Sequence, residues 1–178
     1  AHGKLVLHRH YFFSMIELGR TSGGNNIYDN TLLYGPHVGI SHGNANRESD
    51  NPARSRIHHN TIKTRIVATN GFAISVGSNA DVFSNTLQPF QGHGIGLGSG
   101  SNHVRIYDNL IEPRSWPCSE YATYFYPNAS HGIRIKTYGS GNIHDVDISN
   151  NRIIGRTIPV KSSCYTKISG ITNYIIDS

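Results

Sequence analysis

The sequence has little of what would mark a membrane protein or a nucleic-acid binder. Charged residues are only 15% of the 178, and no apolar run reaches the length of about 18 residues that a membrane-spanning helix needs. Lys and Arg are scattered singly despite a net charge of +5, which argues against a dedicated nucleic-acid partner. Such a basic balance is compatible with an acidic polymer as partner, or with ordinary solubility charge.

Cysteine is also scarce, and strong helix formers are few. Cys118 and Cys164 leave two options open: one disulfide in a secreted protein, or two buried thiols. The 19 glycines, together with many Asn, Ser and Thr residues, put turn signals at short intervals and favour strands over helices. The length suits one domain over residues 1–178, which is either complete or a fragment of a longer chain.

What the sequence has in abundance is an internal repeat. An aliphatic residue, two variable residues, Asn, a variable residue and a second aliphatic residue recur at 27–32, 57–62, 82–87, 106–111 and 148–153. The asparagines step by 30, 25, 24 and 42 residues. A step of roughly two dozen residues is the length of one coil of a parallel β-helix, and the longer steps are coils with inserted loops.

A second string precedes each of the later repeats. It centres on a Gly-Ile or Ala-Ile pair at 39–40, 73–74, 94–95 and 132–133. Gly, Ser and Asn usually separate the two strings, which indicates strand, turn and strand, with alternate residues facing in and out. Stacked about 4.8 Å apart, such coils bury their aliphatic side chains in a continuous column. The sequence therefore predicts an all-β fold: a right-handed parallel β-helix of about six coils.

Stacking of these coils predicts two columns. The first is a ladder of the recurrent asparagines at 30, 60, 85, 109 and 151. It is expected to bond the backbone at one turn, a structural role. The second is an outer aromatic column of Tyr28, His58, Phe83 and Tyr107. It either stiffens that face or offers a platform for sugar rings. His42 falls where other coils have an inward aliphatic residue, which favours a local shift of register.

These strings resemble the right-handed parallel β-helix, or pectin-lyase-like, superfamily from about residue 14 onward. Within it the chain is similar to polygalacturonases, which are pectin-cleaving glycoside hydrolases. Residues 69–75, Thr-Asn-Gly-Phe-Ala-Ile-Ser, resemble that family's Asn-Thr-Asp-Gly-Phe-Asp-Ile-Ser segment. Gly-His-Gly at 92–94 and Ser-His-Gly at 130–132 resemble its Gly-His-Gly motif, and Arg-Ile-Lys at 134–136 resembles its substrate-binding segment.

The carboxylates of that family are missing at the matching positions. Inverting hydrolysis needs one protonated carboxyl group to assist the leaving oxygen and one carboxylate to activate water. The positions that match are Asn70, Gly92 and His93, and none is acidic. The sequence therefore argues against polygalacturonase chemistry. Asp145 and Asp147 are the only close acidic pair near a strand, and they are a weak substitute.

Basic residues remain as candidates for chemistry. His93 and His131 precede equivalent strands in successive coils, and Arg134 and Lys136 follow on the second of them. We predict Arg134 as the ligand of a uronate carboxylate. His93, His131 and Lys136 are the catalytic candidates, since a neutral His or Lys can remove the C5 proton of a uronate in β-elimination. The alternative is that the His-Gly-Ile segments are ordinary β-helix turns.

The inserted segment 112–130 is predicted either to line the sugar cleft or to pack against the coils. It supplies the substrate-binding candidates Trp116, Tyr124 and Tyr126. We predict no cofactor and no metal site, with calcium left open but not indicated. His58 and His59 would face opposite ways on a strand, and calcium needs clustered carboxylates, which the sequence does not indicate.

These expectations favour an extracellular protein that acts on, or binds, an acidic, uronate-containing polysaccharide. If it is an enzyme, polysaccharide-lyase chemistry fits the basic residues best. A non-catalytic carbohydrate-binding or structural module is the main alternative, and a polygalacturonase-like hydrolase is the other. Neither nucleic acid nor a membrane is an expected partner. The sequence leaves open which polysaccharide is involved and which oligomeric state the chain adopts.

Overall fold

The computed structural model is all-β, and the part of the chain that it describes contains no helix. The described residues are 6–8, 14–18, 24–35, 37–43, 53–64, 71–89, 93–98, 100–112, 131–136, 143–154 and 172–177. Nothing in these segments is a helix long and apolar enough to cross a membrane.

The strands belong to three sheets, here named A, B and C, and every pairing within them is parallel. Sheet A contains β1 (Val6–His8), β4 (Thr31–Gly35), β7 (Thr61–Thr64), β10 (Thr86–Pro89), β13 (Leu110–Ile111) and β16 (Arg152–Ile153). Sheet B contains β2 (Ser14–Leu18), β5 (Val38–His42), β8 (Phe72–Val76), β11 (His93–Leu97), β14 (His131–Lys136) and β17 (Thr172–Asp177). Sheet C contains β3 (Asn26–Tyr28), β6 (Ser55–His58), β9 (Ala80–Phe83), β12 (Asn102–Tyr107) and β15 (His144–Ser149).

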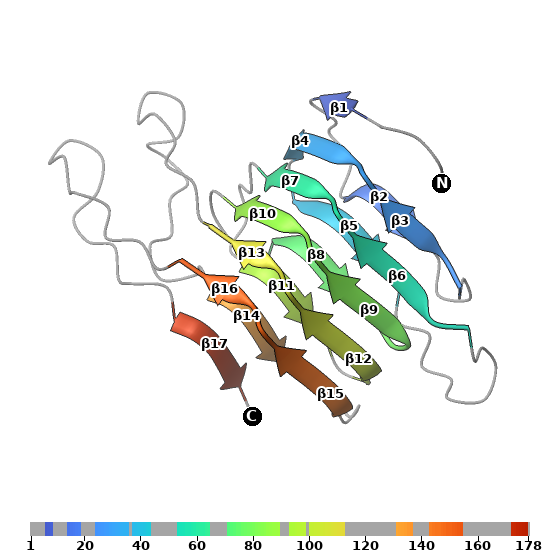
Figure 1. Cartoon of the computed structure of the whole chain (residues 1–178), viewed down its shortest axis with the longest axis vertical. Coiled ribbons are helices and arrows are strands. Elements are labelled where there is room, and N and C mark those ends of the chain that lie inside the picture. Colours follow the sequence, from blue (N-terminus) through green and yellow to red (C-terminus); the bar gives the residue numbers. More distant parts are fainter. Residues whose placement is uncertain are drawn as a thin grey trace, which may run out of the picture.

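Consecutive strands lie in different sheets. The chain passes from sheet B to sheet C to sheet A, and it then returns to sheet B beside the strand it left, as β2, β3, β4 and β5 do (Figure 1). We call one such passage a coil. This arrangement is consistent with a parallel β-helix. It differs in one respect from the expected strand, turn and strand: the Asn-containing strings break at the asparagine, and a coil therefore has three strands.

Each sheet contributes at least one inward column of aliphatic side chains. The sheet C column is Ile27, Ile57, Val82 and Ile106. The sheet A column is Leu32, Ile62, Leu87 and Ile111. The sheet B column is Ile40, Ile74, Ile95 and Ile133. All twelve are buried in one cluster. Since burying one such side chain is worth about 1.5–3 kcal/mol, these columns are the main source of stability.

A second inward residue precedes the sheet B column, and it is small. A Cβ atom on Gly39 would lie 2.5 Å from the carbonyl oxygen of Ala73, and one on Gly94 would lie 2.5 Å from that of Gly132. Both would also meet the methyl group of an inward isoleucine of sheet A at 2.6 Å. The Gly-Ile pairs of the sequence therefore mark the place where the chain turns into sheet B with no room for a side chain.

The corner between sheets C and A has the same backbone in every described coil. The residue before each recurrent asparagine is in the left-handed region, with φ between 52° and 55°, at Asp29, His59, Ser84, Asp108 and Asn150. Asp, Asn and His adopt this region more readily than most residues do. This turn ends the sheet C strand and starts the sheet A strand.

The recurrent asparagines stack at this corner as predicted. The backbone N–H and the Nδ2 of Asn60 both donate to Oδ1 of Asn85, each at 3.0 Å. Asn85 donates in the same way to Asn109, and its Nδ2 also reaches the carbonyl oxygen of Ile57 in the preceding coil. The ladder continues from Asn30 to Asn151. It satisfies backbone groups that would otherwise be buried without partners.

The expected shift of register at His42 is wrong. Glu17 pairs with Ser41 and Leu18 with His42 in regular order, and His42 is buried with 5% of its surface exposed. A shift by one residue would turn Ile40 and its neighbours out of the core, and that costs more than burying one imidazole. Neither ring nitrogen of His42 has a hydrogen-bond partner, and burial lowers the pKa of the ring.

Candidate functional site

The outer face of sheet B brings two of the predicted site residues together. We call its described side chains from β5 to β14 the sheet B wall; they are Val38, Ser41, Phe72, Ser75, His93, Gly96 and Arg134. The column of Ser41 continues into β2 with the exposed acid Glu17. His93 pairs with Phe72 of the preceding strand, and Gly96 pairs with Arg134 of the following one. This wall contains the Gly-Ile strands of the repeat, where the basic cluster was predicted.

His93 and Arg134 are in direct contact. Nη1 of Arg134 lies 2.8 Å from Nε2 of His93. Because a guanidinium group can only donate, Nε2 must accept, and the proton of the neutral imidazole is therefore on Nδ1. His93 is fully buried and Arg134 is 8% exposed, and both make further contacts within the chain.

Phe72 covers this pair, and a missing side chain makes room for it. Its ring lies 4.9 Å from the His93 ring, tilted by 37°. A Cβ atom on Gly96 would lie only 2.1 Å from Cε1 of the Phe72 ring. Gly96 occupies the column in which Ser41, Ser75 and Arg134 carry side chains. That change from Ser to Gly within one column was visible in the sequence, and it was the signal for the packed ring.

This arrangement restricts what each residue can do. Because His93 is neutral in this contact, it orients the Arg134 guanidinium without neutralising its charge, as a carboxylate would. The Nε2 lone pair is occupied by the same contact, and His93 can act as a general base only if that contact breaks. The geometry suits His93 as a positioning residue and Arg134 as an anion ligand.

The other predicted site residues are located by backbone only or not at all. His131 and Lys136 are the first and last residues of β14. The pairing of Ile95 with Ile133, carried back two residues, places His131 on the strand next to His93. Their side chains lie outside the described part of the chain. The same is true of Trp116, Tyr124 and Tyr126, of Asn70 and Gly92, and of Cys118 and Cys164. Their roles stay predictions.

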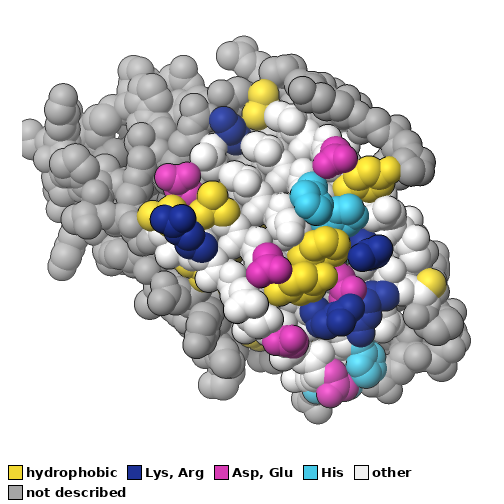
Figure 2. Space-filling model, viewed as in Figure 1, with side chains coloured by type: hydrophobic (Ala, Val, Ile, Leu, Met, Phe, Trp, Pro, Cys, Tyr) yellow, Lys and Arg dark blue, Asp and Glu magenta, His cyan; other side chains and the backbone are white. Residues whose placement is uncertain are grey.

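The outer face of sheet C carries the predicted aromatic column. The rings of Tyr28, His58, Phe83 and Tyr107 lie 4.7–5.2 Å apart, with interplanar angles of 1–12°. Figure 2 shows the column as a band of hydrophobic and histidine side chains beside charged ones. Sugar binding needs an open ring face, but here each inner ring has both faces covered by its neighbours. The column therefore fits the stiffening role better than the sugar platform.

A column of alternating charge runs beside the aromatic one. Arg105 holds Asp81 through two contacts of 2.8 and 2.6 Å, and Arg54 adds a third of 2.9 Å. Burial alone would raise the pKa of Asp81, but the hydrogen bonds of the two arginines outweigh it and leave the pKa below its usual value. Asp147 pairs with Arg105 in the next coil and belongs to this column.

The proposed hydrolytic pair of Asp145 and Asp147 is on the sheet C side, away from the sheet B wall. Asp145 is the second residue of β15, with φ of 52°, and its Oδ2 is 2.9 Å from Nδ1 of His144 and 3.5 Å from Nδ1 of His103. The contact with His144 is the main cause that lowers the pKa of Asp145. A lowered pKa suits an ion-pair partner and not a general acid, which needs a raised one.

The prediction that His58 and His59 face opposite ways is wrong. Their Nδ1 atoms lie 2.8 Å apart. The alternation rule fails because His59 is outside the strand, at the corner with φ of 53°, where the chain turns its side chain back. Burial lowers the pKa of His58, with smaller contributions from His59 and Arg56 in the same direction. Within the described segments, no group of three or more His, Cys, Asp or Glu residues is placed to hold a metal ion.

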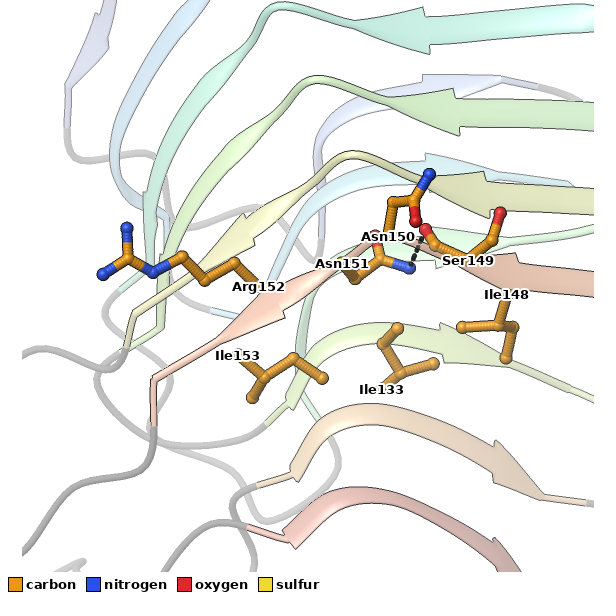
Figure 3. A pocket seen from close by; sticks show the side chains of 7 residues that line it. All are labelled: Ile133, Ile148, Ser149, Asn150, Asn151, Arg152 and Ile153. Atoms are coloured by element: carbon orange, nitrogen blue, oxygen red, sulfur yellow. Dashed lines mark hydrogen bonds between the residues drawn. The ribbon is translucent and has the colours of Figure 1, made fainter.

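One hollow of about 410 Å³ opens inside a coil rather than on the sheet B wall. Its lining residues are Ile133, Ile148, Ser149, Asn150, Asn151, Arg152 and Ile153. Figure 3 shows the three isoleucines grouped on the inner side of the corner, with Asn151 bonded back to Ser149. β15 and β16 are the last described strands of their sheets, and the hollow lies on the inner side of these two strands.

Comparison with protein-family models, with curated proteins and with solved structures finds no significant match to this chain. The resemblance to polygalacturonases therefore depends only on the short motifs within the sequence. This resemblance supports a function only as a hypothesis. The three-sheet fold does not depend on it, because the fold is established by the strand pairings.

Proposed function

We propose that this protein is an extracellular, right-handed parallel β-helix of the pectin-lyase-like kind, with about six coils, that binds an acidic, uronate-containing polysaccharide on the sheet B wall. A right-handed path is expected, because connections between parallel strands are right-handed in nearly all proteins. The contact that carries the proposal is Arg134 held against His93. A fixed guanidinium group is the side chain best suited to a sugar carboxylate.

The shape of the sheet B wall supports a long polymer as ligand. Parallel strands from successive coils run side by side, and a chain of sugars can lie across several of them, as the positions of β5, β8, β11 and β14 allow (Figure 1). Binding of a polyanion is also favoured by the net charge of +5. The segment 112–130, with its aromatic residues, is proposed as one side of the cleft.

If the protein is an enzyme, β-elimination is the reaction that these residues support. Arg134 would bind the uronate carboxylate and stabilise the charge that develops when C5 loses its proton. His131 or Lys136 would take that proton, a C4–C5 double bond would form as the C4–O bond breaks, and the leaving oxygen would take a proton from water. His93 would position Arg134, because its Nε2 lone pair is engaged. No metal ion is required by this scheme.

Binding without cleavage is the second candidate. Asn70, Gly92 and His93 occupy the positions of the family's carboxylates, and hydrolysis therefore lacks its acid and base. His93 is buried and already bound to Arg134, which also leaves one base fewer for elimination. A wall that binds a polyuronate needs only the arginine and the surrounding shape.

One assay separates these functions. The protein is incubated with pectate, alginate and a glycosaminoglycan, and three quantities are measured: absorbance of unsaturated uronate, release of reducing ends, and retention on a gel containing each polymer. Arg134→Gln is expected to lose most binding and all product. Arg152→Gln is the matched control, since Arg152 is exposed on β16 of sheet A.

Each outcome assigns a function. Absorbance and reducing ends together identify a lyase; reducing ends without absorbance identify a hydrolase; retention without product identifies a binding module. The proposal fails if no acidic polymer is retained by the folded protein, or if Arg152→Gln weakens retention as much as Arg134→Gln does. Circular dichroism of both variants checks that each remains folded.

A further inference from the structure

The most specific unassigned cluster is the pair of imidazoles at the corner after β6. His58 stands in the aromatic column with Tyr28 on one side at 5.2 Å and Phe83 on the other at 4.7 Å. This stack holds the plane of the His58 ring. The His59 ring is perpendicular to it, at 85°, and it is exposed at the corner.

A hydrogen bond sets the tautomer of His58. Its Nε2 lies 2.8 Å from Oδ1 of Asn26, which can only accept. The proton is therefore on Nε2, and the lone pair on Nδ1 accepts a hydrogen bond from Nδ1–H of His59 at 2.8 Å. An imidazole whose N–H is held by a carbonyl oxygen while its other nitrogen presents a lone pair is the arrangement that metal-ligating histidines almost always show.

We propose that Nδ1 of His58 and Nδ1 of His59 form a surface site for a divalent transition-metal ion of square-planar or octahedral preference, Cu²⁺ or Ni²⁺, with water completing its coordination. Two nitrogens at about 2.05 Å from one ion are about 2.9 Å apart at a right angle and about 3.3 Å apart at the tetrahedral angle. The observed separation of 2.8 Å matches the right angle. Binding would require the proton of His59 to move from Nδ1 to Nε2, and a turn of this exposed ring then directs both Nδ1 lone pairs to one ion.

The charges around the pair set its strength. Asp29, at the equivalent corner of the neighbouring coil, favours a cation, whereas Arg56 opposes one. Because the charges of Asp29 and Arg56 oppose each other, the affinity for a metal ion is expected to come from the two nitrogen ligands and not from the net charge around them. Calcium, which prefers oxygen ligands, is expected not to bind here.

The test compares matched substitutions at two positions with left-handed backbone, one at the corner between sheets C and A and one at the start of β12. His59→Asn removes one ligand and keeps the backbone, because Asn150 occupies the same left-handed position in another coil. The control is His103→Asn, since His103 has φ of 52° and Asn79 occupies its position in the preceding coil. Asn26→Ala removes the hydrogen bond that orients His58, and it is expected to weaken binding about tenfold, as loss of such a bond typically does.

The full chain is titrated with CuCl₂, NiCl₂, ZnCl₂ and CaCl₂ by calorimetry, and Cu²⁺ is also followed by electron paramagnetic resonance. We expect one Cu²⁺ or Ni²⁺ per chain with two nitrogen ligands in the wild-type spectrum, weaker Zn²⁺ binding and no Ca²⁺ binding. His59→Asn should reduce Cu²⁺ affinity at least about tenfold and leave one nitrogen, while His103→Asn should change neither. Equal affinity and equal spectra for wild type and a folded His59→Asn would overturn the proposal, as would a stronger loss in His103→Asn.

Discussion

The corner between sheets C and A and the sheet B wall follow opposite rules. At the corner, every described coil repeats one residue with φ near 53° and then an asparagine, and each asparagine is bound by another asparagine. On the wall, successive coils place different residues at one level: Val38, Phe72 and His93. Their partners are unlike them, as Arg134 is for His93.

This difference separates scaffold from site. A repeated residue, such as the asparagine of the ladder, is bonded by the same residue in the neighbouring coils. It stabilises the stack only while the column is continuous. A residue that departs from its column must find a different partner, as His93 does in Arg134. Substitutions at the corner should therefore affect the stability of the stack, whereas substitutions on the wall should affect the ligand.

The largest effect is expected from breaking the ladder in its middle. Asn85→Ala removes the acceptor of two N–H groups of Asn60 and the donor to Ile57, all buried. Each unsatisfied buried group costs about 1–3 kcal/mol, and we expect a loss of about 3 kcal/mol or more in urea unfolding. Asn151→Ala is the matched control at the end of the ladder; Asn151 is half-buried, and water can replace part of its bonds, which predicts about half the loss. Equal losses of unfolding free energy in the two variants would contradict the prediction that burial makes the middle of the ladder more important than its end.

A smaller loss is expected where the chain turns into sheet B. Gly94→Ala places a methyl group 2.5 Å from the Gly132 carbonyl oxygen, and the backbone must move. Overpacking of this kind costs about 1–3 kcal/mol, and we expect about 2 kcal/mol by thermal or urea unfolding. Gly98→Ala is the control, since nothing lies within 4 Å of its added Cβ, and its effect should stay within about 0.5 kcal/mol. If Gly94→Ala does not change stability, the backbone at the turn into sheet B can move at a lower cost than the 2.5 Å contact indicates.

A gain in stability is expected at an inward column of sheet B that a polar ring interrupts. His42 takes the place that Leu18 has in the adjacent strand, with two ring nitrogens that have no hydrogen-bond partner. Replacing it by leucine removes a polar burial cost of about 1–3 kcal/mol, and we expect His42→Leu to be more stable by about 1 kcal/mol at pH 7. His42→Gln keeps the polarity, and it should not gain. A destabilised His42→Leu would indicate that the column needs the shape of the ring.

The same residue predicts a pH dependence. Burial lowers the pKa of His42 from its usual 6.5, which means that the unfolded chain binds a proton more readily than the folded one. Stability is therefore complete above pH 6.5 and falls as the pH drops below it, by at most about 1.4 kcal/mol per pH unit. The fall ends once the folded ring is also protonated. Asp81 has a pKa below 3.8 and contributes only in a more acidic window. Unfolding measured from pH 7.5 to 5 should give a steeper profile for wild type than for His42→Leu; parallel profiles would contradict the assignment.

The same comparison explains which parts of the fold could be predicted from the sequence. Repetition identified the coils, the asparagine ladder and the aromatic column, because a column of equal residues is visible in one dimension. It did not show that the strings bend at the asparagine into a third sheet. The signal was present in the residues before each asparagine, such as Asp29 and His59, which tolerate the left-handed backbone.

The candidate site was predicted less completely, for a physical reason. The sequence placed His93 and Arg134 on one face, but not in contact, since their contact depends on Phe72 folding over Gly96 from the preceding coil. It also misjudged His42 and the His58–His59 pair, because a register and a corner overrode the local pattern. A residue that departs from a repeat can be found in the sequence. The residue that it contacts can be found only from the three-dimensional structure.

The smallest expected effect comes from extending a column rather than breaking one. Ser149 pairs with Tyr107 at the position where the aromatic column stops. Ser149→Tyr would continue the stack over Tyr107, and an added aromatic pair is worth about 0.5–1 kcal/mol. Stability should rise by about that amount in urea unfolding, because the corner at Asn150 already fixes the direction of the side chain. Ser149→Leu adds apolar area without a ring and should gain less. If both variants gain equally, the column is stabilised by burial alone and the alignment of its rings contributes nothing further.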